Sequence, residues 1–96
     1  MMNISLDFDD TYTLDPKFWD RFIELCESRG HNIYCVTLRY EHESDAVYRT
    51  IGQMIDHDRI IFAGRKAKAD ICKKRGIDID VWIDDMPWFI AMDEKR

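Results

Sequence analysis

The stretch Ile4-Ser5-Leu6-Asp7-Phe8-Asp9-Asp10-Thr11 is an apolar segment that ends in carboxylates spaced one residue apart. Side chains alternate across an extended strand, so Asp7 and Asp9 return to the same side if the extension persists. In an open parallel sheet, ligands gather outside the carboxyl ends of the strands, where these acids lie. The pattern therefore indicates a site for a divalent cation and a nucleophile. A polar turn of Asp9, Asp10 and Thr11 after a buried strand is the simpler alternative.

The composition predicts one globular domain. The chain has 96 residues, of which 46% are hydrophobic, and a net charge of −5, which argues against a non-specific nucleic-acid binder. Acids interrupt the apolar start, so no signal peptide is expected, and no apolar run approaches the roughly 20 residues that span a bilayer. We expect a cytoplasmic protein without a membrane partner. Cys26, Cys35 and Cys72 lie singly in apolar patterns and predict buried free thiols.

Strand-like and helix-like segments alternate along the chain. Asp15 and Pro16 are typical of a helix start, and Gly30 and Gly76 are typical of helix ends. The expected strands are 3–8, 32–37, 59–63 and 79–83. The expected helices are 16–29, 44–55, 66–75 and a short piece opened by 86–88.

This alternation predicts an α/β fold, a three-layer α/β/α Rossmann-like domain with a small parallel sheet of about four strands, over residues 1–96. Polar residues collect where the strands end. Asp7 and Asp9 follow the first strand, Thr37 ends the second, and Asp84 and Asp85 follow the last. Because parallel strands bring their carboxyl ends to one edge of the sheet, we expect these residues to share one site.

In this order the motifs resemble those of the haloacid dehalogenase-like (HAD) hydrolases, most of which are phosphatases. The family's first motif is an apolar strand followed by Asp-x-Asp-x-Thr, which residues 7–11 match fully. Its second motif is a strand that ends in Thr or Ser, here Thr37. Its third is a lysine at a helix start, and its fourth is an apolar strand that ends in paired acids, here 81–85. The resemblance covers nearly the whole chain.

The resemblance implies a Mg²⁺-dependent phosphohydrolase that cleaves a phosphomonoester. Asp7 would attack the phosphorus and form an aspartyl-phosphate, while Asp9 would protonate the leaving oxygen and later deprotonate the water. Asp7 and Asp84 would hold Mg²⁺, with Asp85 binding directly or through water and Asp9 through its backbone carbonyl. Asp9 also favours a phosphatase over a dehalogenase, because a halide needs no acid to leave.

Charge that develops on the transferring phosphoryl oxygens needs fixed donors, which Thr37 and a lysine would supply. We favour Lys68, because the sequence from Lys68 onward resembles the family's lysine followed directly by its helix. Lys66 lies nearer the strand end and stays open as the lysine of the third motif, and we otherwise assign it to substrate binding. We also assign Thr11 and Arg39 to substrate binding, with a turn residue and an exposed loop arginine as the simpler alternatives.

Only residues 12–15 separate the first motif from the first helix, which leaves no room for a cap domain. Either the substrate closes the site itself, or another subunit of a homo-oligomer does so. We expect a small phosphorylated substrate, such as a nucleotide, a sugar phosphate or a nucleic-acid end. A response-regulator receiver domain also accepts phosphate on an aspartate at a strand end. It is disfavoured because its acids, hydroxyl and lysine follow a different succession of strands, and because it needs a fifth strand. A non-catalytic binding or regulatory protein that keeps the acidic metal site stays open.

Three aromatic residues, Trp19, Phe22 and Trp82, are assigned to the core. Trp19 and Phe22 lie on the inward stripe of the first helix. Trp82 should pack under a helix on the opposite face from its strand neighbours. Trp88 and Phe89 follow the acid pair and are candidates for lining the site or a partner surface.

Overall fold

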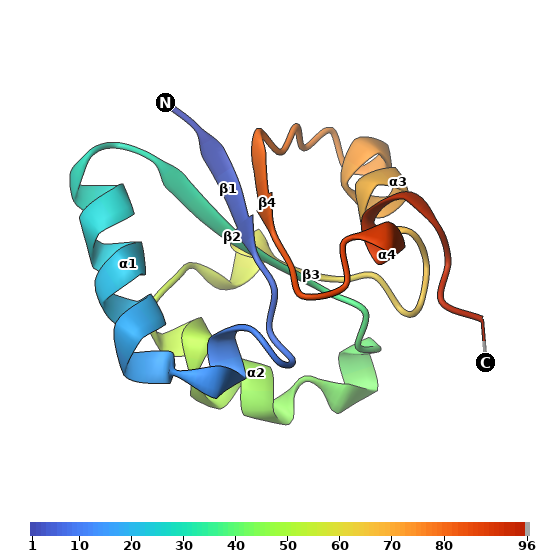
Figure 1. The fold of residues 1–96 in the computed structure, drawn as a ribbon, viewed down its shortest axis with the longest axis horizontal. Helices are drawn as coiled ribbons and strands as arrows, with labels where there is room; N and C mark the ends of the chain where they lie inside the picture. The colour runs from blue at the N-terminus through green and yellow to red at the C-terminus, as the bar shows by residue number, and fades with distance from the viewer. Residues whose placement is uncertain (96) are drawn as a thin grey trace.

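The computed structural model describes residues 1–95, in which strands and helices alternate (Figure 1). The strands are β1 (Asn3–Leu6), β2 (Asn32–Thr37), β3 (Ile60–Phe62) and β4 (Val81–Ile83). The α-helices are α1 (Pro16–Ser28), α2 (Asp45–Arg49), α3 (Lys68–Lys74) and α4 (Trp88–Ala91). Short 3-10 turns lie at Tyr12–Leu14, Glu41–Glu43, Ile51–Gln53 and His57–Arg59.

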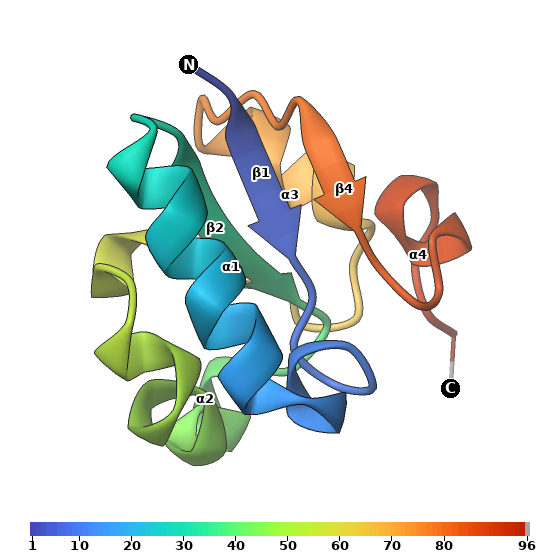
Figure 2. The same cartoon turned by 60° about the vertical axis from the view of Figure 1, so that its left-hand side comes forward.

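The four strands form one parallel sheet in the order β3-β2-β1-β4. This confirms the predicted α/β fold with a small parallel sheet. β1 lies between β2 and β4, with Ile4 opposite both Ile33 and Val81 and with Leu6 opposite Ile83. Because β1 and β4 are neighbours, the acid-bearing segments that follow them leave the sheet side by side (Figure 2).

Two hydrophobic clusters pack against the sheet. The larger includes Ile23 of α1 and Val47 of α2, and the smaller joins Val36 of β2 to Cys72 of α3. Figure 2 shows α1 in front of the sheet and α3 behind it. Trp82 packs in the smaller cluster, against a helix of the opposite side from α1, which confirms its predicted position.

Helix α1 begins where the sequence predicts. The Asp15 side chain accepts a hydrogen bond from the backbone N–H of Phe18 (3.3 Å), as expected for an N-cap. Trp19 and Phe22 are partly buried and pack against the larger cluster. Phe18 and Leu25 are apolar positions of the same helix, but they are 58% and 63% exposed because only one side of α1 faces the sheet.

The continuous helix predicted over 44–55 is wrong. Helix α2 ends before Thr50, whose ψ of −94° leaves the helical region, and a 3-10 turn follows at Ile51–Gln53. The Thr50 hydroxyl donates to the carbonyl oxygen of Ala46 (2.7 Å), a local hydrogen bond that bends helices. Val47 is fully buried all the same, so the apolar spacing identified the core side of the segment without fixing its backbone.

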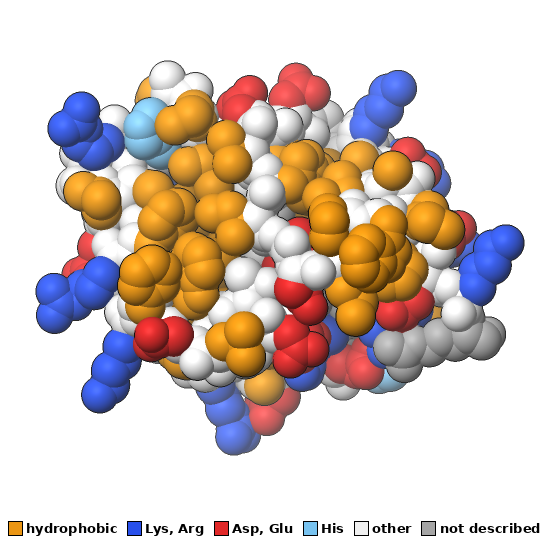
Figure 3. All heavy atoms as spheres, viewed as in Figure 1, with side chains coloured by type: hydrophobic (Ala, Val, Ile, Leu, Met, Phe, Trp, Pro, Cys, Tyr) orange, Lys and Arg blue, Asp and Glu red, His pale blue; other side chains and the backbone are white. Residues whose placement is uncertain are grey.

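The surface seen in Figure 3 has hydrophobic side chains in two areas, over α1 and β1 and over α4, with carboxylates between them. Trp88 of α4 is 53% exposed. All three cysteines are buried and unpaired, as predicted. Within residues 1–95, no helix is both long enough and apolar enough to cross a membrane.

Candidate active site

Asp7 is the first residue after β1 and is buried. Its backbone N–H donates to the carbonyl oxygen of Ile83 (3.0 Å), which continues the β1–β4 pairing beyond the end of β1. The Thr11 hydroxyl donates to Oδ2 of Asp7 (3.2 Å). Asp10 turns the chain between them with a φ of +60°, a conformation that Asp adopts more readily than most residues. The backbone therefore places the Asp7 carboxyl beside the segment that starts at Asp84.

A buried lysine joins the acids of two strands. The Nζ atom of Lys68 lies 2.8 Å from Oδ1 of Asp7 and 2.5 Å from Oδ2 of Asp84, and the lysine side chain is 2% exposed. A buried ammonium is stable only when carboxylates pair with it. Burial alone would lower the pKa of Lys68, but Asp7 and Asp84 outweigh that effect and hold this pKa above its usual value.

The two candidate lysines have different surroundings. Helix α3 begins at Lys68, not at Lys66, after Ala67, whose backbone N–H donates to Oδ1 of Asp93 (2.8 Å). The Lys66 side chain is 67% exposed, and its Nζ atom lies 3.8 Å from Oδ2 of Asp93. The structure thus brings Lys68 to Asp7 and leaves Lys66 on the surface beside the C-terminal segment.

Burial raises the pKa of Asp7 from 3.8 to about 7. Lys68 lowers this pKa in part, while a hydrogen bond with the Asp85 side chain and the charge of Asp84 raise it further. In the absence of a cation, Asp7 therefore carries a proton for part of the time near neutral pH.

Three acids lie close enough to hold one metal ion. Carboxylate oxygens of Asp7, Asp84 and Asp85 lie within 4.8 Å of one another. Hard oxygen donors of this kind suit Mg²⁺, and three carboxylates beside the single ammonium of Lys68 leave net negative charge for a cation to neutralise. Among the described residues, the side chain of Asp9 is not in this group. The sequence prediction placed its backbone carbonyl, not its side chain, on the metal.

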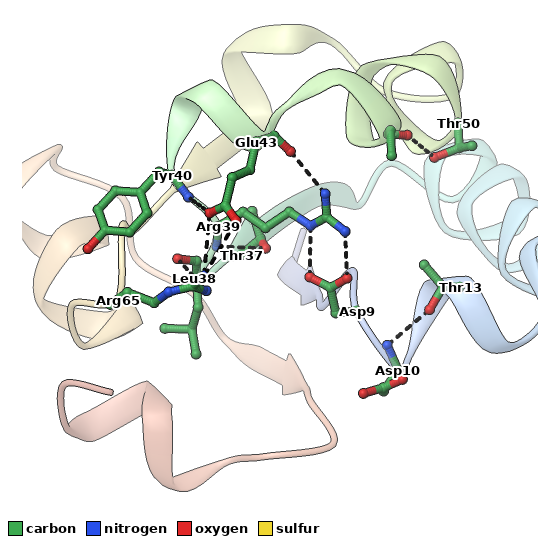
Figure 4. A network of polar contacts seen from close by, with 11 residues as sticks. Asp9, Asp10, Thr13, Thr37, Leu38, Arg39, Tyr40, Glu43, Thr50 and Arg65 are labelled. Atoms are coloured by element: carbon green, nitrogen blue, oxygen red, sulfur yellow. Dashed lines mark hydrogen bonds and ion pairs between the residues drawn. The ribbon is translucent and has the colours of Figure 1, made fainter. Parts of the chain in front are cut away.

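The Asp9 side chain turns to Arg39 instead (Figure 4). Nε and Nη2 of Arg39 donate to the two carboxylate oxygens of Asp9, both at 2.9 Å, in a bidentate ion pair. This hydrogen bonding to Asp9 raises the pKa of the Arg39 guanidinium. Arg39 also donates through Nη1 to the carbonyl oxygen of Glu43 (3.0 Å), and its Cζ atom lies 5.1 Å from the centre of the Phe8 ring.

Thr37 is the last residue of β2 and is 1% exposed. Its Oγ1 atom accepts a hydrogen bond from the backbone N–H of Arg39 (3.2 Å), and its carbonyl oxygen accepts one from Ala63 (2.8 Å). The β2–β3 pairing thus continues beyond the strands and holds Thr37 at the same edge of the sheet as Asp7.

A cavity of about 430 Å³ opens at this edge and is lined from the ends of all the strands. Among the residues that the structure describes, seven of its lining side chains carry carboxylates and three carry positive charges. Its lining residues are Asp7, Asp9, Asp10, Thr37, Leu38, Arg39, Glu43, Arg65, Lys68, Asp84, Asp85, Met86 and Glu94. This excess of negative charge favours the binding of a cation and disfavours that of an anion.

Arg65 and two glutamates line the cavity although the sequence did not indicate them. Nη2 of Arg65 lies 3.4 Å from Oε1 of Glu43, and Nε of Arg65 lies 3.5 Å from Oε1 of Glu94. The Cζ atom of Arg65 lies 5.4 Å from the centre of the Tyr40 ring. Gly64 and Arg65 both have positive φ angles, which turn the chain after β3 toward the cavity. The basic run of residues 65–75 was visible in the sequence, but this turn was not.

Four of the proposed positions, Thr11, Lys66, Trp88 and Phe89, lie outside the cavity lining. Thr11 is buried behind Asp7, to which its hydroxyl is bonded, so it touches the acid and not the open space. Lys66 and Trp88 are on the surface. Met86, next to the acid pair, lines the cavity instead of Trp88 and Phe89.

Comparison of the chain with protein-family models, with curated proteins and with solved structures gave no match. The geometry of the cavity and the order of the motifs are therefore what bears on function.

Proposed function

We propose that this chain is a HAD-like, three-layer α/β/α phosphohydrolase that cleaves a phosphomonoester with the help of Mg²⁺. One observation carries the proposal. Asp7 and Asp84, from the ends of two neighbouring strands, converge on the buried ammonium of Lys68, with Asp85 beside them at the cavity. A nucleophile, a charge-stabilising lysine and a set of cation ligands therefore meet at one point.

In the first half-reaction, a carboxylate oxygen of Asp7 attacks the phosphorus atom. The P–O bond to the leaving group breaks as the new P–O bond to Asp7 forms, and Asp9 donates a proton to the leaving oxygen. Lys68 and the Thr37 hydroxyl donate hydrogen bonds to the phosphoryl oxygens, where negative charge accumulates. Both donors are buried and held by other contacts, so little reorganisation is needed.

In the second half-reaction, the Asp9 carboxylate accepts a proton from water, and the water oxygen attacks the phosphorus atom. The bond between phosphorus and Asp7 breaks, which releases inorganic phosphate and restores the Asp7 carboxylate. Asp9 is again protonated and ready to act as an acid, so the two steps balance. Thr11 acts as a positioning residue, because its hydroxyl fixes one oxygen of the nucleophile.

Asp7, Asp84 and Asp85 would hold Mg²⁺, which when bound would offset the repulsion between these acids and an anionic phosphate. The cavity supports this requirement, since its carboxylates outnumber its cationic side chains. With a cation held there, Asp7 would stay the carboxylate that the attack needs, whereas burial alone favours its protonated form.

A phosphate-release screen tests the proposal. The purified chain is assayed with p-nitrophenyl phosphate, nucleotides, sugar phosphates and phosphorylated oligonucleotides, with MgCl₂ or with EDTA. We expect Mg²⁺-dependent phosphate release that Asp7→Asn abolishes. After an acid quench, intact-protein mass spectrometry of Asp9→Asn with p-nitrophenyl phosphate should show one added phosphoryl group, because this leaving group needs little protonation.

A non-catalytic cation-binding protein is the second candidate, and one observation favours it. The only acid assigned to proton transfer, Asp9, is engaged by Arg39 in the free protein. This candidate predicts Mg²⁺ binding without phosphate release from any compound in the screen. It also predicts no phosphoryl adduct on either variant.

A further inference from the structure

The Arg39 guanidinium is fixed by contacts that do not depend on Asp9. Nη1 donates to the carbonyl oxygen of Glu43, and the backbone N–H of Arg39 donates to Oγ1 of Thr37 (Figure 4). The guanidinium also stacks over the ring of Phe8. The Arg39 side chain is 27% exposed. The guanidinium is therefore a rigid fork, preorganised to bind an anion with two parallel hydrogen bonds.

Asp9 is the movable partner of this ion pair. Its side chain is 50% exposed, and within the described residues both of its hydrogen bonds go to Arg39. Rotation of the Asp9 side chain would free the fork without disturbing the contacts that hold Arg39. The two residues come from the segments after β1 and β2, so the pair closes across the rim of the cavity.

The ion pair conflicts with the role of Asp9 in the proposed mechanism. A general acid must contact the leaving group, whereas both carboxylate oxygens of Asp9 accept hydrogen bonds from the Arg39 guanidinium, each at 2.9 Å. While the pair is closed, both Asp9 oxygens are therefore engaged by Arg39. The free protein is thus in a resting state that substrate must relieve.

We propose that Arg39 is a subsite for a second anionic group of the substrate, and that filling this subsite releases Asp9 for proton transfer. This inference rests on the proposed phosphohydrolase function. The substrate class is a phosphomonoester that carries a carboxylate or a second phosphate, with its reactive phosphoryl group at Lys68 and its other anion at Arg39. Both residues line the same cavity of about 430 Å³, which is large enough for such a molecule.

Kinetics with matched probes test the selectivity. The probes are glycerol 3-phosphate, 3-phosphoglycerate and glycerol 1,3-bisphosphate, at constant free Mg²⁺. We expect wild-type kcat/KM to be about tenfold or more higher for the two bis-anionic probes, the effect of one charge-assisted hydrogen-bonded pair. A preference for 3-phosphoglycerate would identify a carboxylate at Arg39, and a preference for glycerol 1,3-bisphosphate a phosphate.

Arg39→Ala should change the hydrolysis rates of bis-anionic and mono-anionic substrates in opposite directions. Hydrolysis of the bis-anionic probes should fall by about tenfold or more, while kcat for glycerol 3-phosphate should rise, because Asp9 is no longer paired. Arg49→Ala is the matched control, since Arg49 forms an exposed ion pair with Asp45 on α2 away from the cavity. A uniform loss with all probes in Arg39→Ala would overturn the proposal and make Arg39 a structural residue.

A measurement without turnover separates this inference from the proposed function. In Asp7→Asn with Mg²⁺, NMR follows the Nε–H signal of Arg39, identified by its loss in Arg39→Ala, and the carboxyl carbon of Asp9, identified with Asp9→Asn. A bis-anionic probe should shift both signals, and glycerol 3-phosphate should leave the Asp9 signal unchanged. An unchanged Asp9 signal at saturation would overturn the inference even if the wild type is a phosphatase. Shifted signals with no hydrolysis by the wild type would instead retain the anion subsite and reject the proposed function.

Discussion

Lys68 and Asp84 are joined by a contact of 2.5 Å between Nζ and Oδ2, which ties the first residue of α3 to the first residue after β4. The two side chains are 2% and 4% exposed. The same ammonium pairs with Asp7, so one buried cation connects α3 to the segments that follow β1 and β4. Stability and the proposed chemistry therefore depend on the same atoms.

Replacing Lys68 by methionine should destabilise the fold as well as the site. The change leaves two buried carboxylates without their cation, and breaking a buried pair typically costs about 3–5 kcal/mol of unfolding free energy. Turnover should fall on the order of a hundredfold, as expected when one preorganised donor is lost. Urea titration and phosphate release measure the two effects.

Lys66→Met is the matched control, since the exposed pair with Asp93 is worth at most about 1 kcal/mol. In addition, Asp7→Asn should cost less stability in the Lys68→Met background than in the wild type, because the pair is already broken. If Lys66→Met were the more harmful change, the third motif would belong to Lys66.

Mg²⁺ should bind at Asp7, Asp84 and Asp85 and raise the melting temperature in proportion to the logarithm of its concentration. At a hundred times its dissociation constant, a ligand specific for the folded state adds about 2.7 kcal/mol. Asp85→Asn is the informative variant, because Asp85 is exposed and its loss leaves the Lys68 pairs intact. Asp85→Asn should weaken Mg²⁺ binding measured by calorimetry. Asp78→Asn is the control, because Asp78 is exposed and lies outside the acidic cluster, and it should leave Mg²⁺ binding unchanged. Equal affinity in both variants would remove Asp85 from the site.

The strands of the sheet were predictable because a short apolar run in the sequence indicates a buried strand. The runs around Leu6 and Val36 are apolar and lie in the core, and the helix signals at Asp15 act locally through the backbone. The strand-end residues Asp7 and Asp84 came together because a parallel sheet aligns its carboxyl ends, whatever the loops do.

The contacts made by long side chains were not predictable in the same way. Arg39 was assigned to substrate binding, but its bidentate pair with Asp9 depends on a rotamer and on the turn that carries Glu43. Arg65 reaches the cavity through left-handed backbone at a non-glycine residue, which the sequence pattern does not indicate. The predicted second helix ends before Thr50, whose hydroxyl bonds to the carbonyl oxygen of Ala46, a local contact that the apolar spacing does not indicate.

The cysteines should be unreactive in the folded protein. Cys35 is fully buried, and burial raises the pKa of its thiol, so the nucleophilic thiolate is scarce. Burial likewise raises the pKa of Cys26 and Cys72. With Ellman's reagent at pH 8, we expect slow labelling without denaturant and rapid labelling of all three thiols in urea. Rapid native labelling of Cys35 would mean that the sheet opens at β2.

Stability without a divalent cation should fall between about pH 4 and pH 7 because of Asp7. Its pKa is about 7 in the folded protein and 3.8 in the usual reference state, so across this range the folded chain holds a proton that the unfolded chain has released. Unfolding free energy decreases with rising pH wherever the folded state binds more protons, by at most about 1.4 kcal/mol per pH unit for one group. The contribution of Asp7 is thus fully present below pH 4 and lost above pH 7.

Urea titrations in EDTA should show this slope as a difference between the wild type and Asp7→Asn, which keeps the shape but cannot titrate. MgCl₂ should remove the difference in slope, since the bound cation takes the place of the proton. A wild-type stability that rises relative to Asp7→Asn over this range would mean that Asp7 is ionised in the folded protein without metal, held in that form by Lys68.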